Sequence, residues 1–308
     1  MLEIAIMVEG QNGLNWPRWQ QLALSVEQLG FSGLYRSDHY TNASPPDKDS
    51  LELWVSLTWL ATNSSRIKFG PLVSPMSFRN PTMTARMASA LDDLSDGRFI
   101  LGLGAGWQER EHANYGWDLL DVPGRFKRLE EGIQVIIKLL HSDEPCSYSG
   151  SFFQLNEAVL LPRPQREGGP PILIGGNGPK RTLPLAARYA GEWNSIYLTP
   201  SQFAERNKQL DELIISAGRK VEDVRRSMMI GCIHGADQSE VEEKVFTRSK
   251  GARTADDYRN LGLVVGTGDE IVGQLHQYEA AGLEKAMLQW LDLDDLKGLE
   301  LMAEKVLV

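Results

Sequence analysis

His39 is the first residue whose type and position indicate chemistry. It ends the polar run Arg36-Ser37-Asp38-His39, which directly follows a short apolar segment, Phe31 to Tyr35. Imidazole titrates near neutral pH, so His39 could act as a general acid or base, with Asp38 or a backbone group fixing its tautomer. A structural histidine with satisfied hydrogen bonds is the alternative. The position at the carboxyl end of an expected strand adds weight to the catalytic interpretation.

A glycine-rich segment is the second candidate. It follows the apolar run Ile172 to Ile174 and consists of Gly175, Gly176, Asn177, Gly178, Pro179, Lys180, Arg181 and Thr182. Glycine lets backbone N–H groups approach an anion closely, and the helix expected to follow offers the positive end of its dipole beside two basic side chains. The pattern indicates a phosphate site. The alternative is a turn in which glycine only satisfies the backbone geometry.

Two carboxylates follow the apolar run Phe99 to Leu103. Glu109 and Glu111 could be acid–base groups or ordinary solvated charges, and for Glu111 we expect the solvated charge. A metal site is not expected, because the five histidines show no close ligand pairing such as HExxH. These histidines are His39, His112, His141, His234 and His276.

Alternating glycines mark the end of the same apolar run. Gly102, Gly104 and Gly106 resemble part of a dinucleotide fingerprint, but the last glycine of GxGxxG would fall at position 107, which is Trp107. This mismatch disfavours a Rossmann nicotinamide site. Alternating glycine would instead let a flat ring approach the end of the strand. Trp107 and Trp193 could wall such a pocket, or they could pack in the core.

Eight apolar runs are the candidate strands that would position these residues. They are Leu2 to Val8, Phe31 to Tyr35, Ile67 to Val73, Phe99 to Leu103, Ile172 to Ile174, Glu192 to Leu198, Val224 to Ile233 and Lys285 to Trp290. Amphipathic helical spacing separates them, most clearly in Gly124 to His141 and in the segment that Asn80 caps and Pro81 begins. Runs that are apolar on both faces and joined by crossover helices require a parallel sheet covered on each side.

Eight strand–helix alternations favour a (β/α)8 TIM barrel over a doubly wound sheet, in one domain over residues 1–308. The alternation breaks at about 142–168. There, the turn Tyr148 to Phe152 between β-like pieces suggests an inserted hairpin within Cys146 to Pro164. The sequence does not place Gly251 to Gly262 in any element.

Composition narrows the function classes. The formal net charge is −9 over 308 residues and no lysine–arginine run occurs, which argues against a nucleic-acid partner. Cys146 and Cys232 lie far apart and indicate neither a disulfide framework nor a metal cluster. The first ten residues lack the features of a signal peptide, and no apolar run reaches ~18 residues. We expect a cytoplasmic protein with no membrane partner.

At these residues the sequence resembles the bacterial luciferase-like superfamily, and most of all its branch that depends on the deazaflavin coenzyme F420. The fragments that carry the resemblance span nearly the whole chain in order. They are FSGLYRSDH, RIKFGPLVSPMSFRNP, LDDLSDGRFILGLGAGWQEREHANYG, GRFKRLEEGIQV, PPILIGGNGPKRTLPLAARYAGEWN and GTGDEIVGQLHQYEAAGLEK. The resemblance implies a (β/α)8 barrel with an insertion, a homodimer, and F420 or reduced flavin mononucleotide (FMN) bound at the carboxyl end of the barrel.

The resemblance also implies roles for particular residues. Asp38 and Ser74 would touch the ring system. Pro71, Leu72 and Val73 would form a bulge that bends the deazaflavin, often through a non-proline cis peptide. Gly106 would join the cofactor site, and Gly175 to Arg181 would hold the phosphate. His39 matches the position of the catalytic acid or base.

One departure bears on the substrate. The sugar-phosphate dehydrogenases of this superfamily carry a catalytic glutamate directly after the glycine-rich fourth strand, where this chain has Trp107. The difference disfavours glucose 6-phosphate and suggests a less polar substrate in a pocket formed by Trp107, Glu109 and Trp193.

The expected function is hydride transfer between F420 and a small organic molecule, with His39 managing the proton. Two alternatives remain open. One is a monooxygenase that uses reduced FMN and oxygen, and the other is a protein that binds the cofactor without catalysis.

Overall fold

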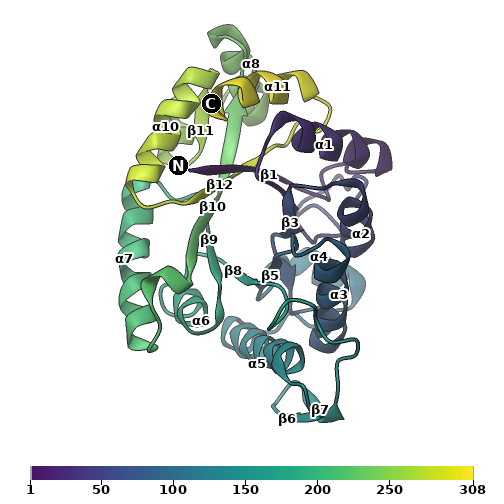
Figure 1. Cartoon of the computed structure of the whole chain (residues 1–308). Coiled ribbons are helices and arrows are strands. Elements are labelled where there is room, and N and C mark those ends of the chain that lie inside the picture. The colour runs from purple at the N-terminus through teal and green to yellow at the C-terminus, as the bar shows by residue number, and fades with distance from the viewer. Residues whose placement is uncertain (1, 308) are drawn as a thin grey trace.

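A parallel β-barrel forms the centre of the computed structural model, which describes residues 2–307 (Figure 1). Its strand order is β3-β2-β1-β12-β10-β9-β8-β5-β4. The strands are β1 (Glu3–Val8), β2 (Gly33–Arg36), β3 (Lys68–Pro71), β4 (Ser74–Pro75), β5 (Leu101–Gly104), β8 (Ile172–Gly175), β9 (Glu192–Ile196), β10 (Arg225–His234) and β12 (Lys285–Gln289). The short β3 and β4 are two halves of one interrupted strand, and a bridge between Phe69 and Phe99 closes the ring. The predicted (β/α)8 barrel is confirmed.

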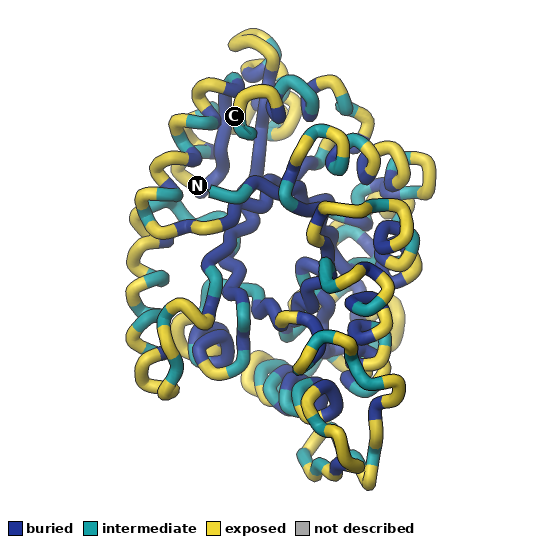
Figure 2. Tube along the Cα trace, in the orientation of Figure 1, coloured by how far each residue is buried: buried dark blue, intermediate teal, exposed yellow. Residues whose placement is uncertain are grey.

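Helices surround the barrel, and the outer faces of these helices are exposed, as the yellow segments of Figure 2 show. The covering helices are α1 (Trp16–Leu29), α2 (Leu53–Asn63), α3 (Pro81–Leu94), α5 (Val122–His141), α6 (Thr182–Tyr189), α7 (Pro200–Ser216), α8 (Gln238–Ser249), α10 (Gly268–Ala280) and α11 (Leu296–Val306). Local sequence sets their starts. Asn80 accepts hydrogen bonds from the N–H groups of Thr82 and Met83, and Pro81 occupies the first turn.

Two apolar layers result from the alternation of side chains along the strands. The larger layer lies between strands and helices and includes Ile4, Ile6 and Val8 of β1. The smaller layer fills the barrel interior. It consists of Ala5, Met7, Tyr35, Leu72, Ile100, Leu173, Met229 and Met287. The strands are apolar on both faces because one face packs against the helices and the other faces the barrel interior.

The alternating glycines of β5 have a packing role that differs from our expectation. A Cβ atom on Gly102 would overlap the carbonyl oxygen of Pro71, and a Cβ atom on Gly104 would press on the Val73 side chain. The glycines therefore make room for the bulge at Leu72–Val73, where the peptide bond is cis as the resemblance implied.

Five elements refine the predicted order. The inserted hairpin is confirmed as the antiparallel pair β6 (Cys146–Ser149) and β7 (Gln154–Ala158). The unplaced segment contains α9 (Ala255–Asn260) and leads to β11 (Val264–Gly266), which pairs with the end of β10. A short helix, α4 (Glu109–Tyr115), follows β5, where the sequence predicted no helix.

Two features are absent from residues 2–307: a membrane-spanning helix and a cluster of metal-binding side chains. No helix there is long and apolar enough to span a bilayer. No group of three or more His, Cys, Asp or Glu side chains there has a metal-binding arrangement. The single-domain boundary, the homodimer and the cytoplasmic location stay predictions.

Candidate active site

A cavity of about 610 Å³ opens at the carboxyl ends of the barrel strands. It is bounded by segments that follow β1, β2, β5, β8 and β9 and by the Leu72–Val73 bulge. His39, Gly106, Trp107 and the start of the glycine-rich segment, Gly175 and Gly176, all line it. The histidine and the glycines therefore face one cavity, although they lie far apart in the sequence. Parallel strands bring their carboxyl ends to the same rim, which makes this convergence possible.

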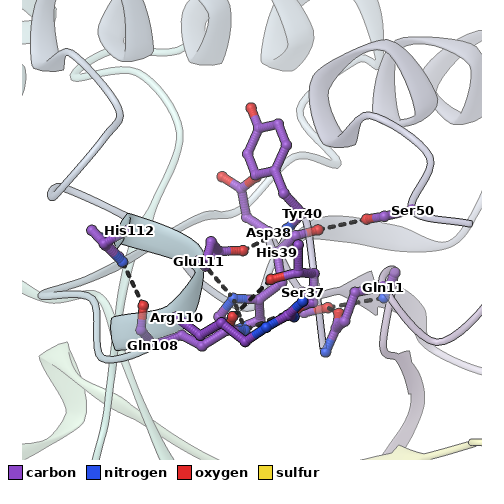
Figure 3. Close-up of polar contacts among 12 residues, drawn as sticks. Gln11, Ser37, Asp38, His39, Tyr40, Ser50, Gln108, Arg110, Glu111 and His112 are labelled. Atoms are coloured by element: carbon purple, nitrogen blue, oxygen red, sulfur yellow. Dashed lines mark hydrogen bonds and ion pairs between the residues drawn. The ribbon is translucent and has the colours of Figure 1, made fainter. Parts of the chain in front are cut away.

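His39 is held by a carboxylate from α4 (Figure 3). Its Nδ1 lies 3.1 Å from Oε1 of Glu111, and the backbone N–H of Tyr40 donates to Oε2 of Glu111 at 2.5 Å. Burial disfavours the charged imidazole, but the hydrogen bond and the charge of Glu111 outweigh it, so the pKa of His39 is raised above its usual 6.5.

Our expectation for Glu111 was wrong, because its side chain is fully buried rather than solvated. The reason is the helix that we did not predict. In α4, Glu111 faces the histidine, whereas Glu109 starts the helix, is exposed, and does not line the cavity. Residues two apart on a helix do not share a face. The predicted place of Glu109 in the substrate pocket is therefore also wrong.

The start of α4 is clamped to the loop after His39. The amide of Gln108 accepts from the hydroxyl of Thr41 at 3.0 Å and donates to the carbonyl of Thr41 at 2.9 Å. The hydroxyl of Ser50 donates to the carbonyl of His39 at 2.6 Å. These bonds fix the backbone on both sides of the His39–Glu111 contact.

Asp38 and Ser74 lie behind the cavity wall and do not line the cavity. Asp38 forms a bidentate ion pair with Arg79, with N–O distances of 2.6 and 2.9 Å, and accepts from the hydroxyl of Ser74 at 2.8 Å. The pair connects the end of β2 with β4 beyond the bulge. Their predicted contact with a flat ring stays a prediction.

The glycine-rich segment approaches the cavity with its backbone. Gly176 adopts φ +127°, which side-chain-bearing residues rarely do. The Asn177 side chain is fully used by the backbone of Ile196: it accepts from the N–H at 2.9 Å and donates to the carbonyl at 2.7 Å. Thr182, the first residue of α6, lines the cavity. An anion here would meet the threonine hydroxyl, while the Gly176 N–H is bonded to the carbonyl of Asn194 at 2.8 Å.

The two basic residues of this segment are placed differently from our expectation. Lys180 and Arg181 are exposed and do not line the cavity, and the structure gives them no ion pair within residues 2–307. Their predicted role in holding a phosphate therefore depends on a ligand that extends beyond the cavity.

Arg125 is a cavity residue that the sequence reading missed. One of its terminal nitrogens donates to the carbonyl of Gly106 at 3.2 Å, its buried Nε has no partner, and no carboxylate within residues 2–307 pairs with it. A guanidinium without a carboxylate partner within residues 2–307, lining the same cavity as Gly176 and Thr182, is suited to bind an anion. The sequence analysis considered only the apolar face of its helix, α5, and therefore did not identify Arg125.

The two tryptophans have different roles. Trp107 is 60% exposed at the cavity mouth, with its ring edge-on to His39 at 5.6 Å between centroids. Trp193 is fully buried, stacks on Phe203, and donates from Nε1 to the carbonyl of Gly176 at 2.8 Å. Trp193 does not line the cavity, so its predicted place in the pocket wall is wrong. It supports the glycine-rich segment from the core side.

A polar chain that the sequence reading also missed lines another part of the cavity. Glu9 accepts from Gln289 at 2.7 Å and from Gln11 at 2.9 Å, and the hydroxyl of Tyr197 donates to Gln289 at 2.5 Å. Tyr197 has φ +50°, an unusual value for a residue with a side chain. Each of these residues lies at or just past a strand end, which is the signal that could have found them.

Comparisons with known proteins place the chain in a family. The model of the luciferase-like monooxygenase family matches residues 3–252. The chain is 29% identical over 242 residues to an F420-dependent glucose-6-phosphate dehydrogenase of Microbacterium testaceum, covering 75% of this chain and 68% of that protein. It is 32% identical over 187 residues to a 4-hydroxyprotoasukamycin monooxygenase of Streptomyces nodosus subsp. asukaensis, covering 61% of this chain and 48% of that protein. The matched part thus spans about half the length of the second relative.

Solved structures share the fold over the whole chain. An F420-dependent secondary alcohol dehydrogenase in complex with an F420-acetone adduct superposes with a TM-score of 0.86 at 20% identity, covering 99% of this chain and 98% of that chain. A monooxygenase from Streptomyces bottropensis gives a TM-score of 0.81 at 19% identity, covering 99% of both chains. The chain belongs to the luciferase-like monooxygenase family, and it is an oxidoreductase of that family.

Proposed function

We propose that this protein transfers a hydride between coenzyme F420 and a small organic substrate, with His39 managing the accompanying proton. The observation that carries the proposal is the shared cavity, because an imidazole and an anion-binding glycine segment face it beside the Leu72–Val73 bulge. Relatives named for F420 dependence support the choice of cofactor.

The residues present fit a flat ring with a phosphorylated tail. The bulge at Leu72 and Val73 lines the cavity beside Gly104, where no side chain intervenes. Thr182 offers a hydroxyl and Arg125 offers a positive charge that no carboxylate within residues 2–307 pairs, whereas the Gly176 N–H already donates to the carbonyl of Asn194 at 2.8 Å. When bound, the deazaflavin would supply the hydride acceptor or donor.

His39 can exchange a proton through one nitrogen only. Nδ1 is engaged with Glu111, and Nε2 has no hydrogen-bond partner within residues 2–307. When an alcohol is oxidised, the hydroxyl proton passes to neutral Nε2 as the hydride leaves the carbon. When a carbonyl is reduced, protonated Nε2 returns that proton to the oxygen. Trp107 stands edge-on beside the imidazole at the mouth of the cavity.

The substrate we propose is less polar than a sugar phosphate. Trp107 occupies the place at which the sugar-phosphate dehydrogenases of the family carry a glutamate, and Val122 and Phe126 line the same cavity. Glu9, Gln11 and Tyr197 supply a limited set of polar groups. A secondary alcohol or a ketone with a moderately sized apolar body suits this mixture.

A monooxygenase that uses reduced FMN and oxygen is the second candidate. The family model and a relative named as a monooxygenase favour it, and both cofactors present a phosphate and a tricyclic ring to the same cavity. A protein that binds the cofactor without turnover is the third candidate.

Titration of the protein with F420 and with FMN, each followed by a turnover assay, separates the three candidates. Tight F420 binding, negligible FMN binding and substrate-dependent change of the F420 absorbance are expected. Oxygen consumption with reduced FMN would replace this proposal with the second candidate. Binding without reoxidation across a panel of alcohols and ketones would leave the third.

A further inference from the structure

We propose that Glu111 is the positioning residue of His39, fixing the ring and the tautomer in which Nε2 is the reacting nitrogen. The inference deepens the proposed function and rests on it only for the identity of the reaction. Position in the sequence alone did not distinguish the carboxylate of Glu111 from an ordinary solvated charge. The contact between His39 Nδ1 and Glu111 Oε1, at 3.1 Å, is the starting point of the inference.

Both oxygens of Glu111 are committed, and the side chain is buried. Oε1 faces His39, and Oε2 accepts from the N–H of Tyr40 at 2.5 Å. An ionised carboxylate accepts hydrogen bonds and donates none, so the proton of neutral His39 must reside on Nδ1. The lone pair of Nε2 then points away from Glu111 and is available to a substrate.

The helix that carries Glu111 cannot shift easily. Its first turn is tied to Thr41 through the side chain of Gln108, and Nδ1 of His112 lies 2.7 Å from the carbonyl of Gln108. Figure 3 shows Glu111 of α4 beside His39, and His112 directed back to the carbonyl of Gln108. The orientation of the imidazole is therefore set by α4 rather than by the strand that precedes His39.

Glu111 also provides the main charge that His39 experiences. Three acidic groups face the imidazole: Glu111 from α4, Glu9 from the end of β1, and Asp38 from its own strand end. Asp38 is neutralised by Arg79, and Glu9 is hydrogen-bonded to two glutamine amides rather than to His39. Glu111 is the only one of the three in hydrogen-bond contact with His39.

Replacing the carboxylate of Glu111 by an amide removes the negative charge while keeping nearly the same side-chain shape. In Glu111→Gln, the amide could accept from Nδ1–H without the charge, or it could donate to Nδ1 and force the proton onto Nε2. Both outcomes disfavour the imidazolium, and the second blocks Nε2 as a proton acceptor. Glu109→Gln is the matched control, because Glu109 is exposed, lies on the same helix and does not line the cavity.

The decisive measurement is an NMR titration of the His39 ring in the protein without cofactor. We expect Glu111→Gln to lower the pKa of His39 by roughly one unit or more, whereas Glu109→Gln leaves it unchanged. Glu111→Asp should fall between wild type and Glu111→Gln. With cofactor, the limb of the kcat profile that reports His39 should move to lower pH by the same amount, and kcat should fall roughly tenfold or more with little change in KM.

An unchanged His39 pKa in folded Glu111→Gln, or an equal shift in Glu109→Gln, would overturn the inference. If Glu111→Gln does not fold, Glu111→Asp decides, because its shorter carboxylate withdraws from Nδ1 and must still lower the His39 pKa. The titration needs no turnover. A wild-type protein that is inactive with both cofactors would therefore defeat the proposed function while the role of Glu111 is still measured.

Discussion

Two contacts between a basic and an acidic side chain lie at opposite ends of the barrel and are built for different tasks. At the carboxyl end, His39 contacts Glu111. At the amino end, Lys285 donates to both oxygens of Glu192 at 2.8 and 2.9 Å and approaches the hydroxyl of Tyr35 at 3.4 Å. Lys285 and Glu192 are the first residues of β12 and β9, and both are buried.

The difference between the pairs lies in what is left unpaired. The ammonium group of Lys285 has three hydrogens and three partners, so the amino-end pair has nothing to offer a ligand. In the carboxyl-end pair, His39 keeps Nε2 free and lines a cavity. A fully satisfied pair stabilises the barrel, whereas a pair with one free nitrogen can do chemistry. The two ends of a TIM barrel divide in this way in general.

The largest expected effect comes from breaking the amino-end pair. Lys285→Met leaves the carboxylate of Glu192 buried without a cation, and we expect it to lower the free energy of unfolding by about 3–5 kcal/mol. Chemical denaturation measures the change. Lys297→Met is the control, because Lys297 pairs with Glu300 at the surface and should change stability by less than about 1 kcal/mol.

The double variant Glu192→Leu/Lys285→Met sharpens this test. Replacing both charges by apolar side chains should recover much of the lost stability, because no unpaired charge then remains. A double variant as unstable as the single one would mean that packing, rather than charge, dominates at this end.

Breaking the carboxyl-end pair should cost catalysis. We expect His39→Ala to cut turnover by a factor on the order of 100 or more while cofactor affinity stays within about twofold. Steady-state kinetics and a cofactor titration measure both quantities. His276→Ala, a change of an exposed histidine on α10, should leave both unchanged. Unaltered turnover in His39→Ala would remove the imidazole from the mechanism.

Arg125 tests whether the unpaired charge in the cavity binds the cofactor. We expect Arg125→Ala to weaken the affinity for a phosphorylated cofactor roughly tenfold, because a charge-assisted hydrogen bond is lost. Lys127→Ala is the control, since this neighbour contacts Ser151 at the surface. Equal affinities of the two variants would place the phosphate away from Arg125.

Asp92 gives the smallest expected effect and is far from both pairs. Burial raises the pKa of this α3 carboxyl to about 6 in spite of Arg166 at 3.2 Å. The pKa of Asp92 in the folded state lies above the usual value of 3.8. The contribution of the protonated carboxyl to folding stability is therefore complete below pH 3.8 and is lost as the pH rises through about 6. Wild type should therefore gain stability relative to Asp92→Asn as the pH falls from about 7.5 to about 5, by about 1 kcal/mol. Paired thermal melts at both pH values measure this, and parallel melting curves would contradict it.

The fold was predictable from the sequence because its signals are local. Buried strands, capped helices and the hairpin insertion all leave apolar runs, Asn–Pro starts or turn residues. The segment 251–262 lacked such signals, since α9 and β11 are short and β11 attaches only to the end of β10.

The site was only partly predictable, because its contacts are long-range. His39 and Gly176 were found from their positions after strands. The sequence did not reveal Glu111, Arg125 and Glu9. Glu111 and Glu9 are distinguished by hydrogen bonds to distant segments, and Arg125 is distinguished by the lack of a carboxylate partner within residues 2–307. Trp193 shows the reverse error, since an aromatic residue near a site was mistaken for part of its wall.

Trp193 connects the carboxyl-end rim of the barrel with the surrounding helix α7. Its ring stacks on Phe203 of α7, and its indole N–H donates to the carbonyl of Gly176. A change in how α7 packs would therefore be felt at a backbone segment that a ligand would touch. Variants selected only for a better-filled interior between β9 and α7 would alter ligand affinity as a side effect.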